Sequence, residues 1–116
     1  MLKAVALTMT LVVVAGCGAS RSYRRGLQAQ NAQQFDEAVE YYRQALQGAP
    51  DKPEYKIALE RAMQTAATFH VARGRAFETE GRGDEALREY RRAMEYDPSN
   101  RSVAARAGEL DRELRD

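Results

Sequence analysis

The chain contains one phrase twice, as DEAVEYYRQA at residues 36–45 and as DEALREYRRA at residues 84–93. The copies are offset by 48 residues, and at that offset Gly26 also matches Gly74 and Pro50 matches Pro98. An internal repeat of this kind indicates a supersecondary unit that buries its apolar face against a second copy. We therefore expect stacked helical hairpins, an architecture typical of binding scaffolds.

Both copies of the phrase have the apolar spacing of an amphipathic helix, with steps of three and four. In the first copy these positions are Phe35, Ala38, Val39, Tyr42, Ala45 and Leu46. Asp36 and Glu37 would lie in its first turn, where carboxylates favour the positive end of the helix dipole. Gly48 and Pro50 are expected to end this helix, and Pro98 to end the second copy.

The segment between the two copies predicts one long helix, from Pro53 to Glu80, followed by a turn at residues 81–83. A helix of about 28 residues would be roughly 42 Å long. Ser99 or Asn100 can cap a last helix, whose single apolar stripe suits a terminal cap. This stripe consists of Val103, Ala107, Leu110 and Leu114. Beyond the N-terminal segment the sequence has no strand signal, so the predicted fold class is all-α.

The two copies resemble the tetratricopeptide repeat, which has a glycine, an alanine, an aromatic residue, an alanine and a proline at fixed steps. The positions that carry the resemblance are Gly26, Ala38, Tyr42, Ala45 and Pro50, and Gly74, Phe77, Ala86, Tyr90, Ala93 and Pro98. The resemblance implies that these residues pack the repeats, as a solenoid of two helical hairpins. The repeats would span about 19–52 and 67–100, with a capping helix at 100–115.

The family period is about 34 residues, so the offset of 48 leaves an extra segment at residues 53–66. We expect these residues to extend the first helix of the second repeat by roughly 21 Å beyond the stack. Tyr55, Ile57, Leu59 and Met63 would lie on this extension, facing a partner or a second copy. The alternative is a separate helix with a bend near Thr65.

The family implies a concave groove, lined by the first helix of each repeat, that binds segments of other proteins. The corresponding groove positions are Tyr23, Leu27 and Gln30 in the first repeat, and Thr68, Val71, Arg75 and Glu78 in the second. Some relatives hold a C-terminal carboxylate with a clamp of Lys, Asn and Arg. The clamp positions here hold Tyr23, Leu27, Val71 and Ala72, so we do not expect capture of a chain terminus.

The N-terminal residues have the layout of an export signal: Lys3, an apolar run at residues 4–14, and small residues before Cys17. The apolar run of about 11 residues makes a helix of roughly 16 Å, too short for a hydrocarbon core of roughly 30 Å. The sequence VAGC at residues 14–17 resembles the lipobox of bacterial lipoproteins. The expected organisation is therefore a signal peptide at 1–17 and a helical domain at 18–116.

The lipobox resemblance implies that Cys17 is lipidated and anchors the mature chain to a membrane. Because Gly18 follows Cys17, the family rule for enteric-type bacteria implies the outer membrane, facing the periplasm. The alternative is an ordinary cleaved signal in which the only cysteine is incidental.

Charge and composition argue against several other functions. Without Lys3 the chain has 17 basic and 17 acidic residues, whereas a nucleic-acid-binding protein needs a basic excess. One histidine and one cysteine cannot form a typical zinc site, and His70 is expected to pack or to lie at the surface. We expect no catalytic residues, no metal and no cofactor, so the chain is not predicted to be an enzyme.

These expectations favour a membrane-anchored adaptor that binds a protein partner and aids assembly of a secretion or pilus machine. One alternative is an N-terminal fragment of a secretin-like channel protein of type II secretion or pili, because the order of segments resembles some of these proteins. The segments concerned are the lipobox, the first repeat, residues 52–56, the second repeat and residues 97–101. Another alternative is a structural lipoprotein that associates with itself as a homo-oligomer.

Overall fold

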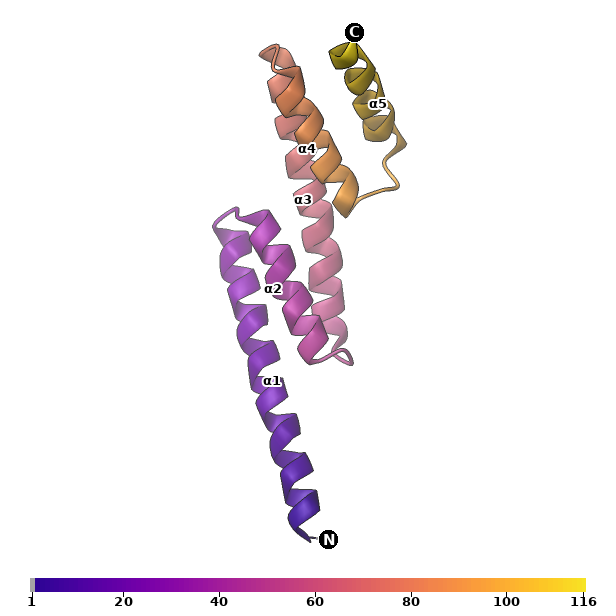
Figure 1. Cartoon of the computed structure of the whole chain (residues 1–116). Helices are drawn as coiled ribbons and strands as arrows, with labels where there is room; N and C mark the ends of the chain where they lie inside the picture. The colour runs from indigo at the N-terminus through magenta and orange to yellow at the C-terminus, as the bar shows by residue number, and fades with distance from the viewer. Residues whose placement is uncertain (1) are drawn as a thin grey trace. The chain divides into compact units, whose positions relative to one another are not determined.

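The computed structural model describes the backbone of residues 2–116 and the side chains of residues 17–116. That backbone forms five helices and no strand, which confirms the predicted all-α, helical-hairpin fold (Figure 1). The helices are α1 (Leu2–Asn31), α2 (Phe35–Gly48), α3 (Pro53–Thr79), α4 (Gly83–Tyr96) and α5 (Arg101–Arg115). Of the predicted signal peptide, only Cys17 and the helical backbone that begins α1 lie within the described part.

The chain divides into two compact units, Met1–Ala62 and Met63–Asp116, and the boundary falls inside α3. Unit 1 contains α1, α2 and the first part of α3. Unit 2 contains the remainder of α3 with α4 and α5. α3 is continuous from Pro53 to Thr79, so the extra segment is not a separate helix.

In unit 1, α1 and α2 form a hairpin (Figure 1). α2 buries one face, made of Ala38, Val39, Tyr42 and Ala45. Small residues allow the helices to approach closely: a side chain added at Gly48 would lie 3.0 Å from the Cβ atom of Ala19. The hairpin therefore depends on small side chains at its contacts, as the repeat pattern predicts.

The prediction that Tyr55 lies on a projecting extension is wrong. Its side chain is only 3% exposed and belongs to the core cluster of Ala19 and Ala45. Its ring also lies 5.0 Å from that of Tyr23. The physical reason is that the first part of α3 covers the apolar side of the α1–α2 hairpin. Ile57, two residues further, is exposed.

Unit 2 has an equivalent closing helix. The core of this unit combines residues of α4 and α5, namely Ala86, Leu87, Tyr90, Ala93, Val103, Ala107 and Leu110. Val103 of α5 stands 48 residues after Tyr55, and both are buried. The side chain of Asn100 caps α5 by accepting a hydrogen bond of 3.1 Å from the Val103 amide. Of the two residues predicted as candidates, Asn100 and not Ser99 is therefore the N-cap of α5.

The two hairpin turns share one hydrogen-bond pattern but differ in one residue. The amides of Gln33 and Gln34 bond to the carbonyls of Gln30 and Ala29, and those of Gly81 and Arg82 bond to the carbonyls of Glu78 and Phe77. This pair of bonds is the Schellman motif, which needs one residue with positive φ. Gly81 has a φ of 76°, and Gln33 has a φ of 60°. The first turn therefore places a side chain where the second has a glycine.

We expect Gln33→Gly to stabilise the chain by about 0.5–1 kcal/mol, because glycine adopts positive φ without the steric cost of a Cβ atom. The reciprocal change, Gly81→Gln, should be destabilising by a similar amount. Urea denaturation followed by circular dichroism measures both. Equal stability of all three chains would contradict the left-handed conformation at these positions.

Candidate functional site

Gly26 and Gly74, the glycines at equivalent positions of the two repeats, each leave space for a tyrosine ring. A Cβ atom added at Gly26 would lie 2.5 Å from Cε1 of Tyr42, and one added at Gly74 would lie 2.5 Å from Cε1 of Tyr90. Both rings are almost completely buried. The glycine and the tyrosine are thus one packing element, repeated in both units.

The hydroxyl groups of these tyrosines also have equivalent partners. Tyr42 donates a hydrogen bond of 2.9 Å to Oε1 of Gln30, and Tyr90 donates one of 2.5 Å to Oε2 of Glu78. Gln30 and Glu78 are related by the same offset of 48 residues. Two residues predicted to line a ligand groove therefore serve as acceptors for the repeat tyrosines.

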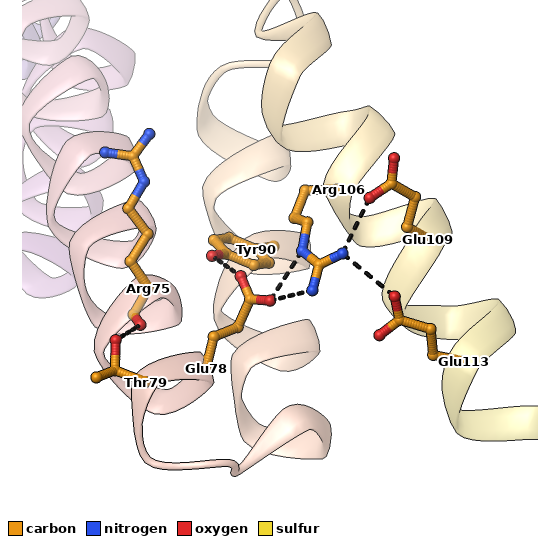
Figure 2. Close-up of polar contacts among 7 residues, drawn as sticks. All are labelled: Arg75, Glu78, Thr79, Tyr90, Arg106, Glu109 and Glu113. Atoms are coloured by element: carbon orange, nitrogen blue, oxygen red, sulfur yellow. Dashed lines mark hydrogen bonds and ion pairs between the residues drawn. The ribbon is translucent and has the colours of Figure 1, made fainter.

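In unit 2 the acceptor belongs to a larger ionic network, which Figure 2 shows across α3, α4 and α5. Arg106 donates from Nε and from one terminal nitrogen to Oε1 of Glu78, the Nε contact being 2.8 Å. Its other terminal nitrogen lies 2.9 Å from Glu109 and 3.4 Å from Glu113. The hydrogen bonds from Arg106 and Tyr90 hold the pKa of Glu78 below its usual value. Burial and the bond to Glu78 raise the pKa of Tyr90 to about 12.

Glu78→Gln should lower the melting temperature at pH 7. It should also make the melting temperature vary less between pH 3 and pH 7. The pKa of Glu78 is depressed in the folded chain, so its stabilising contribution is complete above the unfolded value of 4.5 and is lost as the pH falls through the lower, folded pKa. The glutamine still accepts from Tyr90, as Gln30 does from Tyr42. Thermal melts between pH 3 and pH 7 should converge for the two chains at low pH. A difference that stays constant over this range would contradict the prediction.

A cleft of about 490 Å³ lies in unit 2 between α3, the end of α4 and the start of α5. Its lining is Gln64, Ala67, Thr68, Val71, Ala72, Arg75, Ala93, Asp97, Asn100 and Val103. Three of the predicted groove residues, Thr68, Val71 and Arg75, are thus brought together. Glu78 lines an adjoining hollow of about 280 Å³, but its carboxylate already accepts hydrogen bonds from Tyr90 and Arg106.

The predicted groove residues of the first repeat are arranged differently. Tyr23 is half-buried, with its ring 5.7 Å from that of Tyr42, so it helps to pack unit 1. Leu27 is 40% exposed. Gln30 is exposed, although its amide oxygen accepts from Tyr42. Leu27 is therefore the most accessible apolar side chain of this predicted set.

The other predicted residues fall into two groups. Ala38, Ala45, Ala86 and Ala93 are buried, and Phe77 packs against the core of unit 2. Pro50 and Pro98 are exposed and follow the C-caps Ala49 and Asp97, so they end helices rather than fill the core. Cys17 is exposed, with a free thiol.

His70 is buried, at 5% exposure, inside unit 2. Its Nδ1 lies 2.6 Å from Oε2 of Glu89, and its ring stacks on that of Tyr96 with centroids 6.0 Å apart. These contacts join α3 to α4. The sole histidine is therefore a packing residue with a polar partner.

The described residues lack two further features. No group of three or more histidine, cysteine, aspartate or glutamate side chains is placed there to hold a metal ion. Within the same part, no helix combines the length and the apolar character needed to cross a membrane.

Two stretches of the chain, residues 21–54 and 67–100, match family models of the tetratricopeptide repeat. Together they cover more than half of the 116 residues, so this chain belongs to the tetratricopeptide-repeat proteins. Such repeats bind other proteins and are generally not catalytic, which makes the chain a protein-interaction module. A comparison with curated proteins found no significant match. The lipobox and secretin-like resemblances stay predictions.

Proposed function

We propose that this chain is a lipid-anchored adaptor of the bacterial envelope, which holds a protein partner in the cleft of unit 2. The observation that carries the proposal is the meeting of Thr68, Val71 and Arg75 on one side of a cleft of about 490 Å³. The cleft is concave and lined by five polar and five apolar residues, so it can both hydrogen-bond a ligand and bury part of its surface. The partner would be a subunit of a secretion or pilus machine, because small lipoproteins with such repeats often serve the assembly of these machines.

The anchor in this proposal is a set of acyl chains on Cys17, in the outer membrane and facing the periplasm. The sequence VAGC and the exposure of Cys17 favour it. Lipidation with two signals or chains gives stable attachment, whereas one chain binds only reversibly. The anchor would keep the adaptor at the membrane while its repeats bind.

Site-specific photo-crosslinking tests the binding cleft. Ala72 and Ala76 are both exposed alanines of α3, but only Ala72 lines the cleft. Benzoylphenylalanine would be introduced at either position of the full chain in living cells, and adducts would be identified by mass spectrometry. We expect a discrete partner at Ala72 and none at Ala76. The same adducts at both positions, or none at either, would contradict binding in the cleft.

The anchor is tested by Cys17→Ser, with the intact mass and the membrane fraction as measurements. The unchanged chain should carry the mass of attached acyl chains and stay with outer membranes. Cys17→Ser should lose that mass. A wild-type mass without acyl chains would reject the anchor and leave the cleft experiment unaffected.

A further inference from the structure

We infer that the unit 2 cleft binds an extended segment of a partner protein in which an aspartate or glutamate side chain adjoins an aliphatic one. This inference rests on the proposed function and specifies the chemistry of the partner. It is carried by the charges and hydrogen bonds of the side chains that line the cleft.

Arg75 is the cationic residue of the lining, and it is exposed. Within the described residues, no ion pair or side-chain hydrogen bond engages its guanidinium group. Side chains of a helix lean toward its N-terminus, and in Figure 2 Arg75 extends away from the Glu78–Arg106 contacts. Glu78, three residues further along, is already held by Arg106 and Tyr90. The guanidinium of Arg75 is therefore available to a ligand.

The other polar groups of the lining are mostly satisfied within the chain. Oδ1 of Asp97 accepts bonds of 3.1 and 2.5 Å from the amide and hydroxyl of Ser99. Asn100 accepts from the Val103 amide, and the Thr68 hydroxyl donates to the Gln64 carbonyl at 3.0 Å. The cleft consequently offers, at Arg75, a cation whose planar donors match a carboxylate. Asp97 keeps its negative charge, and its Oδ1 is directed to Ser99.

The apolar part of the cleft adjoins Arg75. Val71 precedes it by one helical turn, and Ala93 and Val103 face the same space from α4 and α5. These side chains are small or β-branched, which leaves room for an aliphatic side chain of a ligand. From Gln64 to Arg75 the cleft follows α3 for roughly 16 Å, which an extended segment of about five residues would span. The acidic side chain would lie at the Arg75 end.

The test is a nuclear magnetic resonance titration of the isotopically labelled full chain with synthetic octapeptides. Each peptide has blocked termini, glycine and serine flanks, and one central pair: Leu–Asp, Leu–Asn, Leu–Lys or Ser–Asp. We expect Leu–Asp to shift the amides of Val71, Arg75 and Val103 and to bind about five-fold more tightly than Leu–Asn, the gain of one exposed ion pair. Leu–Lys and Ser–Asp should both bind more weakly than Leu–Asp.

Arg75→Gln should remove the preference for Leu–Asp over Leu–Asn without changing the melting temperature. The matched control is Arg88→Gln, which removes another exposed arginine of unit 2 that lies outside the cleft. This control should keep the preference. Loss of preference in both variants would show a general effect of net charge and overturn the inference.

Equal affinities for Leu–Asp and Leu–Asn, shifts confined to other surfaces, or no shift at millimolar peptide would also overturn it. So would tighter binding of a peptide whose only carboxylate is a free C-terminus. The proposed function fails separately, in the crosslinking experiment at Ala72. A partner crosslinked there, together with peptides that do not discriminate charge, would keep the adaptor and reject the acidic segment.

Discussion

Replacing Tyr90 with alanine is expected to lower the free energy of unfolding by about 3–5 kcal/mol, the usual cost of removing a buried aromatic side chain. The ring of Tyr90 is 2% exposed, contacts Gly74 of α3 and belongs to the core shared with α5. Its loss leaves a cavity at the point where the three helices of unit 2 meet. Urea denaturation followed by circular dichroism measures the change. Tyr90→Phe keeps the ring and should cost only about 1 kcal/mol, for one hydrogen bond.

Gly74→Ala tests whether the Tyr90 ring is the reason that residue 74 is a glycine. With Tyr90 present, the new Cβ atom would lie 2.5 Å from the ring, and overpacking of this kind costs about 1–3 kcal/mol. Alanine also favours a helix over glycine by about 1 kcal/mol. We therefore expect a net loss of stability in the wild-type chain and a gain of about 1 kcal/mol in the Tyr90→Ala background. A loss of the same size in both backgrounds would refute the packing explanation.

Ala86→Phe is the second change expected to have a large effect. Ala86 is 0% exposed in the core of unit 2, where its small side chain permits close packing of α4. A phenyl ring there should cost at least about 1–3 kcal/mol, because the neighbouring side chains and backbone must shift. The expected result is a melting temperature lower by several degrees, since 1 kcal/mol corresponds to roughly 4–8 °C in a domain of this size.

Ala76→Phe is the matched control for this experiment. Ala76 is an exposed alanine in the same unit, so the same substitution should change stability by no more than about 0.5 kcal/mol. Similar melting temperatures for the two variants would contradict the packing of Ala86. Ala38→Phe repeats the test in unit 1, where Ala38 is also 0% exposed.

The helices and the contacts within each hairpin could be predicted because they depend on local spacing. Apolar residues at steps of three and four predict α2 and α4, and the turn at 81–83 predicts the end of α3. The offset of 48 residues predicts that Gly26 and Gly74 have the same environment. The structure shows this, with a tyrosine ring against each.

Contacts outside the repeat pattern could not be predicted in the same way. Arg106 is the main partner of Glu78, but the residue 48 positions before it is Ala58, so the comparison of copies gives no sign of an ion pair. The prediction that Glu78 lines a ligand groove therefore did not include its hydrogen bonds with Tyr90 and Arg106. The burial of Tyr55 had a signal, since Val103 stands at the same offset on a predicted capping helix. The glycine at 81 similarly marked Gln33 as a position with positive φ.

The ultraviolet absorbance of Tyr42 and Tyr90 can report whether the hairpins are folded. The chain has six tyrosines and no tryptophan, so phenolate absorbance is not obscured by indole. Burial raises the pKa of Tyr42 above 10.0, and burial together with the bond to Glu78 raises that of Tyr90 to about 12, so both ionise at a higher pH than a tyrosine of the unfolded chain. Their contribution to stability is complete below the unfolded pKa of 10.0 and is lost as the pH rises through the folded values. An alkaline absorbance titration thus distinguishes an intact hairpin from an open one without any label.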